Sequence, residues 1–133
     1  MSQDNVELVR RAWEHFISTQ VVPEELLAPD FVWDMSPFGG WLEQPYYEGV
    51  EQVSAFLRDW AEPFDELKFV IEGYHDAGDD VVTVITQHGR AKASRVPVEM
   101  RYAVVTSVRN GLQTRAKVYA DPAEAFKATG LEH

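Results

Sequence analysis

Three side chains in the sequence have the chemical types and positions that acid–base chemistry needs. Asp34 ends a short apolar segment, where a carboxylate could remove a proton from carbon next to a carbonyl group. Arg101 follows Glu99 by two residues in a strand-like segment, so both side chains point to one face. His88 is the third candidate, because histidine is the residue type best suited to proton transfer near neutral pH. Asp34, Arg101 and His88 are therefore the candidate catalytic residues.

Motifs for metals and cofactors are missing from the sequence. Its four histidines form no pair spaced by four residues and no His-x-Glu cluster, and it contains no cysteine. A glycine-rich phosphate loop, a serine elbow and a dinucleotide fingerprint are also missing. We predict no metal site and no cofactor. A Glu–Arg pair two residues apart is common in strands, so a simple ion pair is the alternative interpretation of Arg101.

Large aromatic side chains gather in the segments expected to cover a sheet. The sequence holds four tryptophans, more than the core of a small domain usually needs. Large rings suit a flat apolar ligand. With apolar neighbours from the strands, the predicted ligand-binding residues are Trp13, Phe16, Trp33, Met35, Trp41, Tyr46, Phe56, Trp60, Ala103 and Val105. The alternative is that these side chains only fill the core.

Hydrophobic periodicity predicts the elements that must position these residues. Helices are expected over residues 4–18, 23–28, 50–61 and 121–130. Strands are expected over residues 31–35, 67–75, 81–91, 96–108 and 112–119, with a packed, aromatic-rich loop over 36–49. Asp4 and Glu7 form a capping box for the first helix, and Asp121 caps the last one.

The dipeptide Asn110-Gly111 predicts a tight hairpin between the last two strands. Regular pairing across this turn sets Arg115, Lys117 and Tyr119 opposite the residues Thr106, Val104 and Tyr102. This half-polar surface would suit a dimer interface better than an apolar pocket.

The order of the elements predicts the class of fold. Mostly helical sequence comes first and strands follow, which indicates an α+β fold with a strongly curved mixed sheet covered by three to four helices. Such an arrangement leaves a cavity between the helices and the sheet. We expect one domain over residues 1–133.

Composition narrows the classes of function. The net charge of −10 would repel a phosphate backbone, so nucleic-acid binding is not expected. No apolar run is long enough to span a bilayer and no signal peptide is recognisable, so we expect a cytoplasmic protein without membrane contact. The final Leu131-Glu132-His133 matches the start of an expression-tag scar, and His133 is kept out of every site.

The chain resembles the nuclear-transport-factor-like superfamily, and within it the SnoaL-like branch. The resemblance covers nearly the whole chain and lies in residues 4–13, 30–34, 47–51, 76–79, 89–90, 98–103, 118–121 and 128–131. It implies a cone built from a curved sheet and three helices, and a homodimer formed through the open face of the sheet. The family includes ketosteroid isomerases, polyketide cyclases, epoxide hydrolases, dehydratases and binding proteins without catalysis, so the fold alone does not choose a function.

Ketosteroid isomerases use a carboxylate on the first strand, opposed by a tyrosine and a protonated aspartate. In an ungapped match the base position falls on Met35, with Asp34 one residue away. The tyrosine position falls on Ala12 or Trp13, and the acid position near Val105. Without an oxyanion partner a carboxylate loses about 3–4 kcal/mol of barrier reduction. Isomerisation by that mechanism is not expected.

The resemblance also bears on the other two catalytic candidates. An epoxide-hydrolase relay needs two carboxylates around a guanidinium, which Glu99, Arg101 and Asp34 could supply. In the family-like match Gln87 lines the cone, so His88 is expected on the open face of the sheet.

Two main hypotheses follow, together with a weaker one. The first is an isomerase or cyclase in which burial among Trp33, Trp41 and Trp60 raises the pKa of Asp34 and makes it the base. The second is a binding protein that holds a small apolar molecule without catalysis. The third is an interaction scaffold whose cone is filled by side chains.

Overall fold

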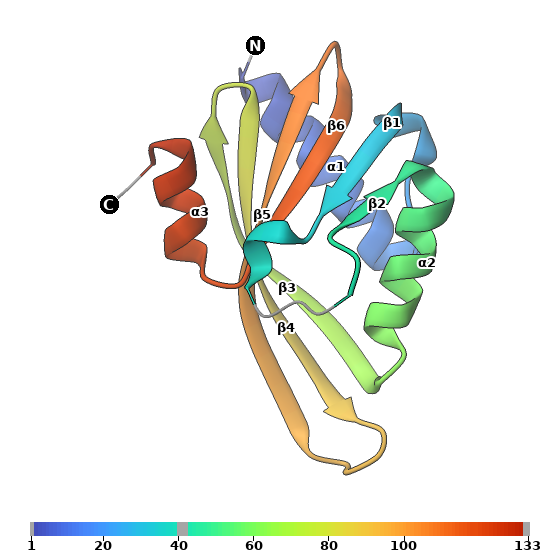
Figure 1. Ribbon diagram of the computed structural model, residues 1–133. Coiled ribbons are helices and arrows are strands. Elements are labelled where there is room, and N and C mark those ends of the chain that lie inside the picture. The colour runs from blue at the N-terminus through green and yellow to red at the C-terminus, as the bar shows by residue number, and fades with distance from the viewer. Residues whose placement is uncertain (1, 40–42, 132–133) are drawn as a thin grey trace.

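The computed structural model describes residues 2–39 and 43–131 (Figure 1). The helices of this part of the chain are α1 (Ser2–Thr19), α2 (Gly49–Ala61) and α3 (Pro122–Thr129), with short 3₁₀ turns η1 (Glu24–Leu26) and η2 (Ser36–Phe38). The strands are β1 (Leu27–Asp34), β2 (Tyr46–Glu48), β3 (Phe64–Ala77), β4 (Asp80–Ala91), β5 (Pro97–Arg109) and β6 (Leu112–Tyr119).

The strands form one six-stranded sheet in the order β2-β1-β6-β5-β4-β3. The pair β1–β6 is parallel, and all other neighbours are antiparallel. The sheet is strongly curved, and its long strands β3, β4 and β5 extend beyond the others (Figure 1). The predicted α+β class with a curved mixed sheet is confirmed.

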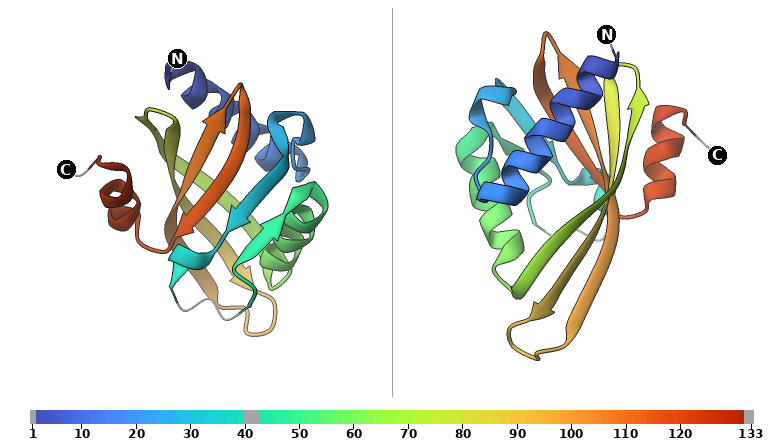
Figure 2. Two further views of the ribbon diagram at one scale, coloured as in Figure 1. Left: turned by 45° about the horizontal axis from the view of Figure 1, so that its top comes forward. Right: turned by 180° about the vertical axis from the view of Figure 1, so that it is seen from behind.

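Helices cover both faces of the sheet, but unequally (Figure 2). On the concave face, α1 and α2 enclose the main core, which contains Trp33, Phe56 and Tyr102. On the opposite face, α3 packs its Ala125 against Val84 and Val105. The lower parts of β3, β4 and β5 on that face carry no helix (Figure 2).

The N-terminal elements differ from the prediction at two places. The first helix begins at Ser2, so Asp4 lies in its first turn and is not the cap. The predicted helix over 23–28 is only the three-residue turn η1, and β1 begins at Leu27. Pro29 is tolerated in β1 because the pairing with β6 is interrupted between Leu27 and Val32, where its missing amide leaves no bond unmade.

The strand β2 was not predicted, since Tyr46–Glu48 falls inside the segment expected to be a loop. It pairs with β1 through Val32, Trp33 and Asp34 and forms an edge of the sheet. A strand of this length carries too few residues to show a period of two.

The hairpin at Asn110-Gly111 is confirmed, because both residues have positive φ values of 54° and 74°. Its predicted register is wrong. Val108 pairs with Gln113 but Ser107 pairs with Arg115, so β6 has one extra residue, Thr114. This bulge sets the side chains of Arg115, Lys117 and Tyr119 on the face opposite to the predicted one, beside Ser107, Val105 and Ala103.

The last helix is bounded as its sequence predicts. The Asp121 carboxylate accepts a hydrogen bond from the Ala123 amide at 3.0 Å, and Pro122 occupies the first turn. Gly130 ends the helix in the left-handed conformation at φ 78°.

Among the described residues, no helix has both the length and the apolar character needed to cross a membrane.

Candidate functional site

A cavity of about 510 Å³ lies between the two helices of the concave face and the sheet. Its lining comes from the C-terminal halves of α1 and α2, from the end of β1 and from the inner faces of β3, β5 and β6. The lining residues are Trp13, Phe16, Gln20, Val21, Val22, Trp33, Met35, Ser54, Phe56, Leu57, Arg58, Trp60, Ala61, Glu62, Phe69, Lys92, Tyr102 and Val118.

Aromatic rings form a continuous wall around this cavity. The ring centroids of Trp33 and Phe56 lie 5.8 Å apart, those of Phe56 and Trp60 5.9 Å, and those of Trp60 and Tyr102 6.0 Å. The first pair joins β1 to α2, and the last joins α2 to β5. Phe56 and Trp60 meet because they are four residues apart on one helix face. Trp13 and Phe16 extend the wall from α1.

Two further hollows lie beside the cavity and share lining residues with it. A small hollow of about 60 Å³ lies between α1 and the sheet, and its lining includes the buried side chains of Thr106 and Gln113. A second hollow of about 660 Å³ lies beyond Phe56 and Trp60, which line both spaces. These two rings therefore separate the cavity from its neighbour.

One buried polar side chain lies at the base of the aromatic wall. Gln87 on β4 is only 2% exposed. Its Oε1 atom accepts hydrogen bonds from Trp60 Nε1 at 2.7 Å and from the Tyr102 hydroxyl at 2.9 Å. Burial raises the pKa of Tyr102 and outweighs the opposite effect of the Trp60 indole, so this phenol stays neutral. The group links α2 to β4 and β5 and fixes the position of the Trp60 ring.

Charged side chains are confined to the mouth of the cavity. Lys92 Nζ lies 3.4 Å from Glu62 Oε1. Glu62 caps the C-terminus of α2, and the exposed Arg58 lies in the last turn of that helix. Among the described lining residues Glu62 is the only carboxylate. Away from the mouth, the described lining thus carries no charged group.

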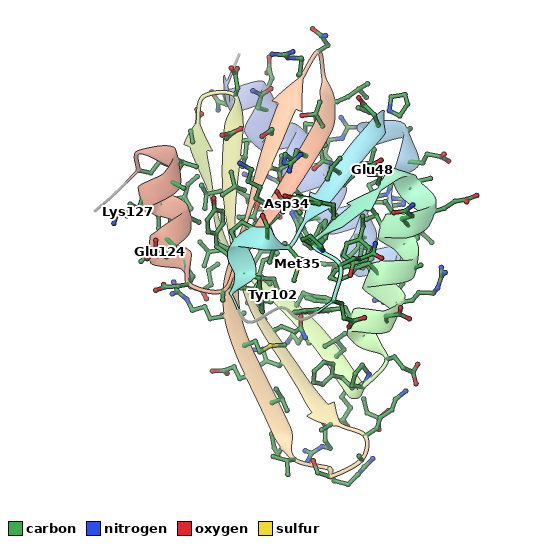
Figure 3. All side chains as sticks on the ribbon, viewed as in Figure 1. Asp34, Met35, Glu48, Tyr102, Glu124 and Lys127 are labelled. Carbon is green, nitrogen blue, oxygen red and sulfur yellow. The ribbon has the colours of Figure 1, made fainter. Side chains whose placement is uncertain are left out.

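The structure places Asp34 outside the cavity. Its neighbours Trp33 and Met35 line the cavity, whereas the buried Asp34 carboxylate points to the other face of the sheet (Figure 3). There its Oδ2 atom accepts a hydrogen bond from Arg115 Nη2 at 2.6 Å, and its Oδ1 atom accepts one from the Ser36 amide at 2.8 Å. The Tyr46 ring lies over Arg115, 5.7 Å from the guanidinium carbon.

The pKa of Asp34 is lowered, so the predicted rise is wrong. Burial of the carboxyl group acts to raise the pKa, as expected. Hydrogen bonds from Ser36 and the contact with the Arg115 guanidinium act in the opposite direction and together prevail. The carboxylate is held ionised, which suits a structural ion pair more than a base.

The other two catalytic candidates lie on the open face of the sheet. Arg101 Nε lies 2.9 Å from Glu72 Oε2 rather than beside Glu99. His88 Nδ1 lies 3.2 Å from Glu99 Oε1, on the face where the sequence analysis expected it. Arg101 and Asp34 therefore have different partners, and the relay proposed for Glu99, Arg101 and Asp34 is not assembled. Thr86 also donates a hydrogen bond to Glu72.

The predicted ligand-binding residues divide between the two faces of the sheet. Six of them line the cavity: Trp13, Phe16, Trp33, Met35, Phe56 and Trp60. Ala103 and Val105 require a correction, because they pack in the cluster under α3 on the far face. Tyr46 also lies outside the cavity, 48% exposed beside Arg115. Trp41 lies outside the described residues.

Several lining residues were missed by the sequence analysis, chiefly Tyr102, Phe69, Leu57 and Val118. Side chains along β5 point alternately to the two faces of the sheet, so Tyr102 could have been predicted if the face towards the cavity had been known. The sequence concealed that face because Tyr102–Thr106 is buried throughout, under the helices on one side and α3 on the other.

In the described part of the chain, no three His, Asp or Glu side chains gather in a way that could hold a metal ion. The cavity lining is mostly apolar and suits a ligand recognised by its rings.

Comparison with solved structures gives many similar folds at low sequence identity. An NTF2-like protein of unknown function from Burkholderia pseudomallei K96243 has a TM-score of 0.71 and 24% identity, over 93% of this chain and 95% of the other. A protein proposed to be a SnoaL-like polyketide cyclase from Jannaschia sp. CCS1 has a TM-score of 0.73 and 20% identity, over 98% and 94%. TerC, co-crystallised with polyporic acid, has a TM-score of 0.71 and 16% identity, over 96% and 98%.

No curated protein matches the sequence. The model of the SnoaL-like domain family matches residues 9–116, which span every lining residue of the cavity except Val118. This match covers most of the chain, and the curved sheet with its helices agrees with the similar structures. The chain therefore belongs to the SnoaL-like domain family.

Proposed function

We propose that this protein binds a small, flat, apolar molecule in the cavity between α1, α2 and the sheet. The observation that carries the proposal is a cavity of about 510 Å³ walled by aromatic rings, whose described lining residues carry charge only at its mouth. Its size falls within the usual range of roughly 300–1,000 Å³ for small-molecule sites. Rings already fixed by packing lose little entropy when a flat ligand stacks between them.

The similar structures support a small molecule as the ligand. TerC was crystallised with polyporic acid, and the Jannaschia protein is proposed to be a polyketide cyclase. Low identity limits these likenesses to the fold, so the ligand of this chain is argued from its own cavity. The open space also favours a binding role over a scaffold with a filled cone.

The geometry favours a protein that binds its ligand without using Asp34 as a base. The carboxylate is on the far face of the sheet and is engaged by Arg115 and Ser36. The position that a family base would occupy is Met35, whose thioether has no proton-accepting role at neutral pH. Isomerase or cyclase chemistry in this cavity would have to start from another group.

The test is to fill the cavity and measure the loss of binding. We expect fluorene, a flat hydrocarbon of three rings, to bind the wild-type protein in equilibrium dialysis. The substitution Ala61→Trp adds a large ring to the lining of the cavity and should weaken fluorene binding at least about tenfold, a change of about 1.4 kcal/mol.

The matched control is Ala128→Trp, which adds the same ring on the exposed side of α3. This control should bind fluorene with wild-type affinity. If fluorene does not bind the wild-type protein, or binds Ala61→Trp unchanged, the cavity is not the binding site.

We also propose that the protein forms a homodimer through the part of the sheet that α3 leaves uncovered. This face carries the Glu72–Arg101 and His88–Glu99 pairs around the exposed Val70. A two-fold axis would let the same patch meet its own copy.

A further inference from the structure

We infer that the ligand carries one carboxylate at the end of its flat apolar ring system, and that Arg58 binds this carboxylate at the mouth of the cavity. This inference rests on the proposed function, because it names the chemical class of the ligand of the same cavity. Such a molecule would stack its rings on the aromatic wall and keep its charge at the exposed mouth, where it stays in contact with water.

Arg58 lines the cavity and has no partner for its charge within the described part of the chain. It lies in the last turn of α2, exposed to solvent. Its guanidinium takes part in none of the ion pairs there. The N–H groups of a guanidinium form a fork that fits the two oxygen atoms of a carboxylate. Arg58 can therefore bind a carboxylate without giving up an ion pair to a described residue.

Lys92 adds a second positive charge to the lining at the mouth. Its Nζ atom lies 3.4 Å from Glu62 Oε1, and its backbone amide donates a hydrogen bond to the Pro63 carbonyl at 2.9 Å. Glu62 follows Arg58 by four residues and has helical backbone angles, so the two side chains are neighbours on α2. The described lining thus has two positive charges against one negative charge, although the whole chain has a net charge of −10.

This balance of charge favours a carboxylate over other end groups. The single excess positive charge matches a single negative charge on the ligand. A phosphate monoester would bring a second negative charge close to Glu62 with no cation left to offset it. A cationic group would be attracted by Glu62 but repelled by Arg58 and Lys92.

A simpler role for Arg58 is to stabilise the C-terminus of α2, where a positive charge in the last turn is favourable. That role does not require Arg58 to line the cavity, and it predicts no preference among ligands. The partial negative charge of the same helix end also weakens the attraction for an anion. The expected preference for a carboxylate is therefore modest.

Two probes of nearly equal size test for this preference. Fluorene-2-carboxylate and fluorene-2-carboxamide share one flat skeleton, and at pH 7 only the first is charged. Equilibrium dialysis at low salt should show that the wild-type protein binds the carboxylate about twofold to fivefold more tightly, the ratio expected for one exposed ion pair. Salt at about 1 M should bring this ratio close to one, because it screens exposed charges.

Variants at the mouth should change the ratio in opposite directions. Arg58→Gln removes the guanidinium and should lower the ratio to one or below. Glu62→Gln removes the competing carboxylate and frees Lys92, so it should raise the ratio by about twofold. Poor folding of a variant cannot imitate such a rise. The matched control is Arg11→Gln, which removes the same charge from an exposed position of α1 outside the lining and should keep the wild-type ratio.

The outcomes separate this inference from the proposed function. If fluorene binds but the wild-type protein does not prefer the carboxylate, or if the preference survives in Arg58→Gln, the inference alone is overturned. A ratio that Glu62→Gln leaves unchanged or lowers also overturns it. Failure of fluorene and of both derivatives to bind overturns the proposed function and the inference together.

Discussion

At the scale of single residues, the main lesson comes from Asp34. A carboxylate at the end of an apolar strand looks like a shielded base, and burial does act in that direction. Its partner Arg115, 81 residues away in sequence, and Ser36 lower the pKa of Asp34 by more than burial raises it. Because Asp34 also accepts a hydrogen bond from the Ser36 amide, it holds the turn that follows β1. This turn carries Met35, which lines the cavity, and Phe38, which lines the second hollow.

Replacing this carboxylate should affect stability and leave the cavity intact. We expect Asp34→Asn to lower the free energy of unfolding by about 2 kcal/mol at pH 7, because a buried charge-assisted hydrogen bond is lost. The folded-state pKa is lowered, so the stabilisation is complete above the unfolded-state pKa and disappears as the pH falls through the folded-state value. Urea unfolding at pH 7 and in acid should show the wild type and the variant converging.

Asp30→Asn is the matched control, since Asp30 is exposed on the same strand. Its effect should stay within about 0.5 kcal/mol. Equal losses for the two variants at pH 7 would mean that the Arg115 contact contributes nothing to folding.

At the scale of elements, the bulge in β6 decides which side chains reach the cavity. The extra residue Thr114 reverses the face that each later side chain of β6 occupies. Ala116 and Val118 therefore face the concave core, and Arg115 faces outward to Asp34. Thr114 is an ordinary strand residue, and nothing in its local sequence marks a bulge. A regular hairpin register would have turned the arginine into the cavity.

This interpretation predicts that Thr114 can be deleted. Without it, Gln113 and Arg115 become neighbours that already pair with Val108 and Ser107, so the sheet keeps its faces and loses about 1–2 kcal/mol of stability. Deletion of Lys117 instead moves Val118 and Tyr119 to the wrong faces and should prevent folding. Far-UV circular dichroism and thermal melting distinguish the two cases; a Thr114 deletion as damaging as the Lys117 deletion would contradict the assignment of the extra residue.

At the scale of the whole molecule, the sequence predicted the parts with strong local signals. The turn at Asn110-Gly111 and the cap at Asp121 depend on a few adjacent residues, and the order of the elements gave the α+β class. The site was harder because it depends on contacts between distant segments. The prediction that Ala103 lines the ligand site was wrong because β5 is buried on both faces. The sequence of such a strand shows no alternation of apolar and polar residues.

The proposed homodimer can be tested on the uncovered face of the sheet. Val70 points outward there, 37% exposed, so a charge at its position would meet its own copy across a two-fold axis. We expect Val70→Asp to convert a dimer into a monomer in sedimentation velocity at micromolar concentration. Val96→Asp makes the same change at the exposed end of the β4–β5 hairpin and should leave the dimer unchanged. A wild-type monomer, or a dimer that survives Val70→Asp, would exclude this face.

The parallel pairing of β1 with β6 also has a consequence for how the chain is made. The cavity wall formed by Trp33 and Met35 has no sheet neighbour on one side until β6 has left the ribosome. The 81 residues from Asp34 to Arg115 take roughly 4–16 seconds at a synthesis rate of about 5–20 residues per second. During that interval the aromatic segment around β1 stays open to chaperones, and the ligand has no complete site to bind.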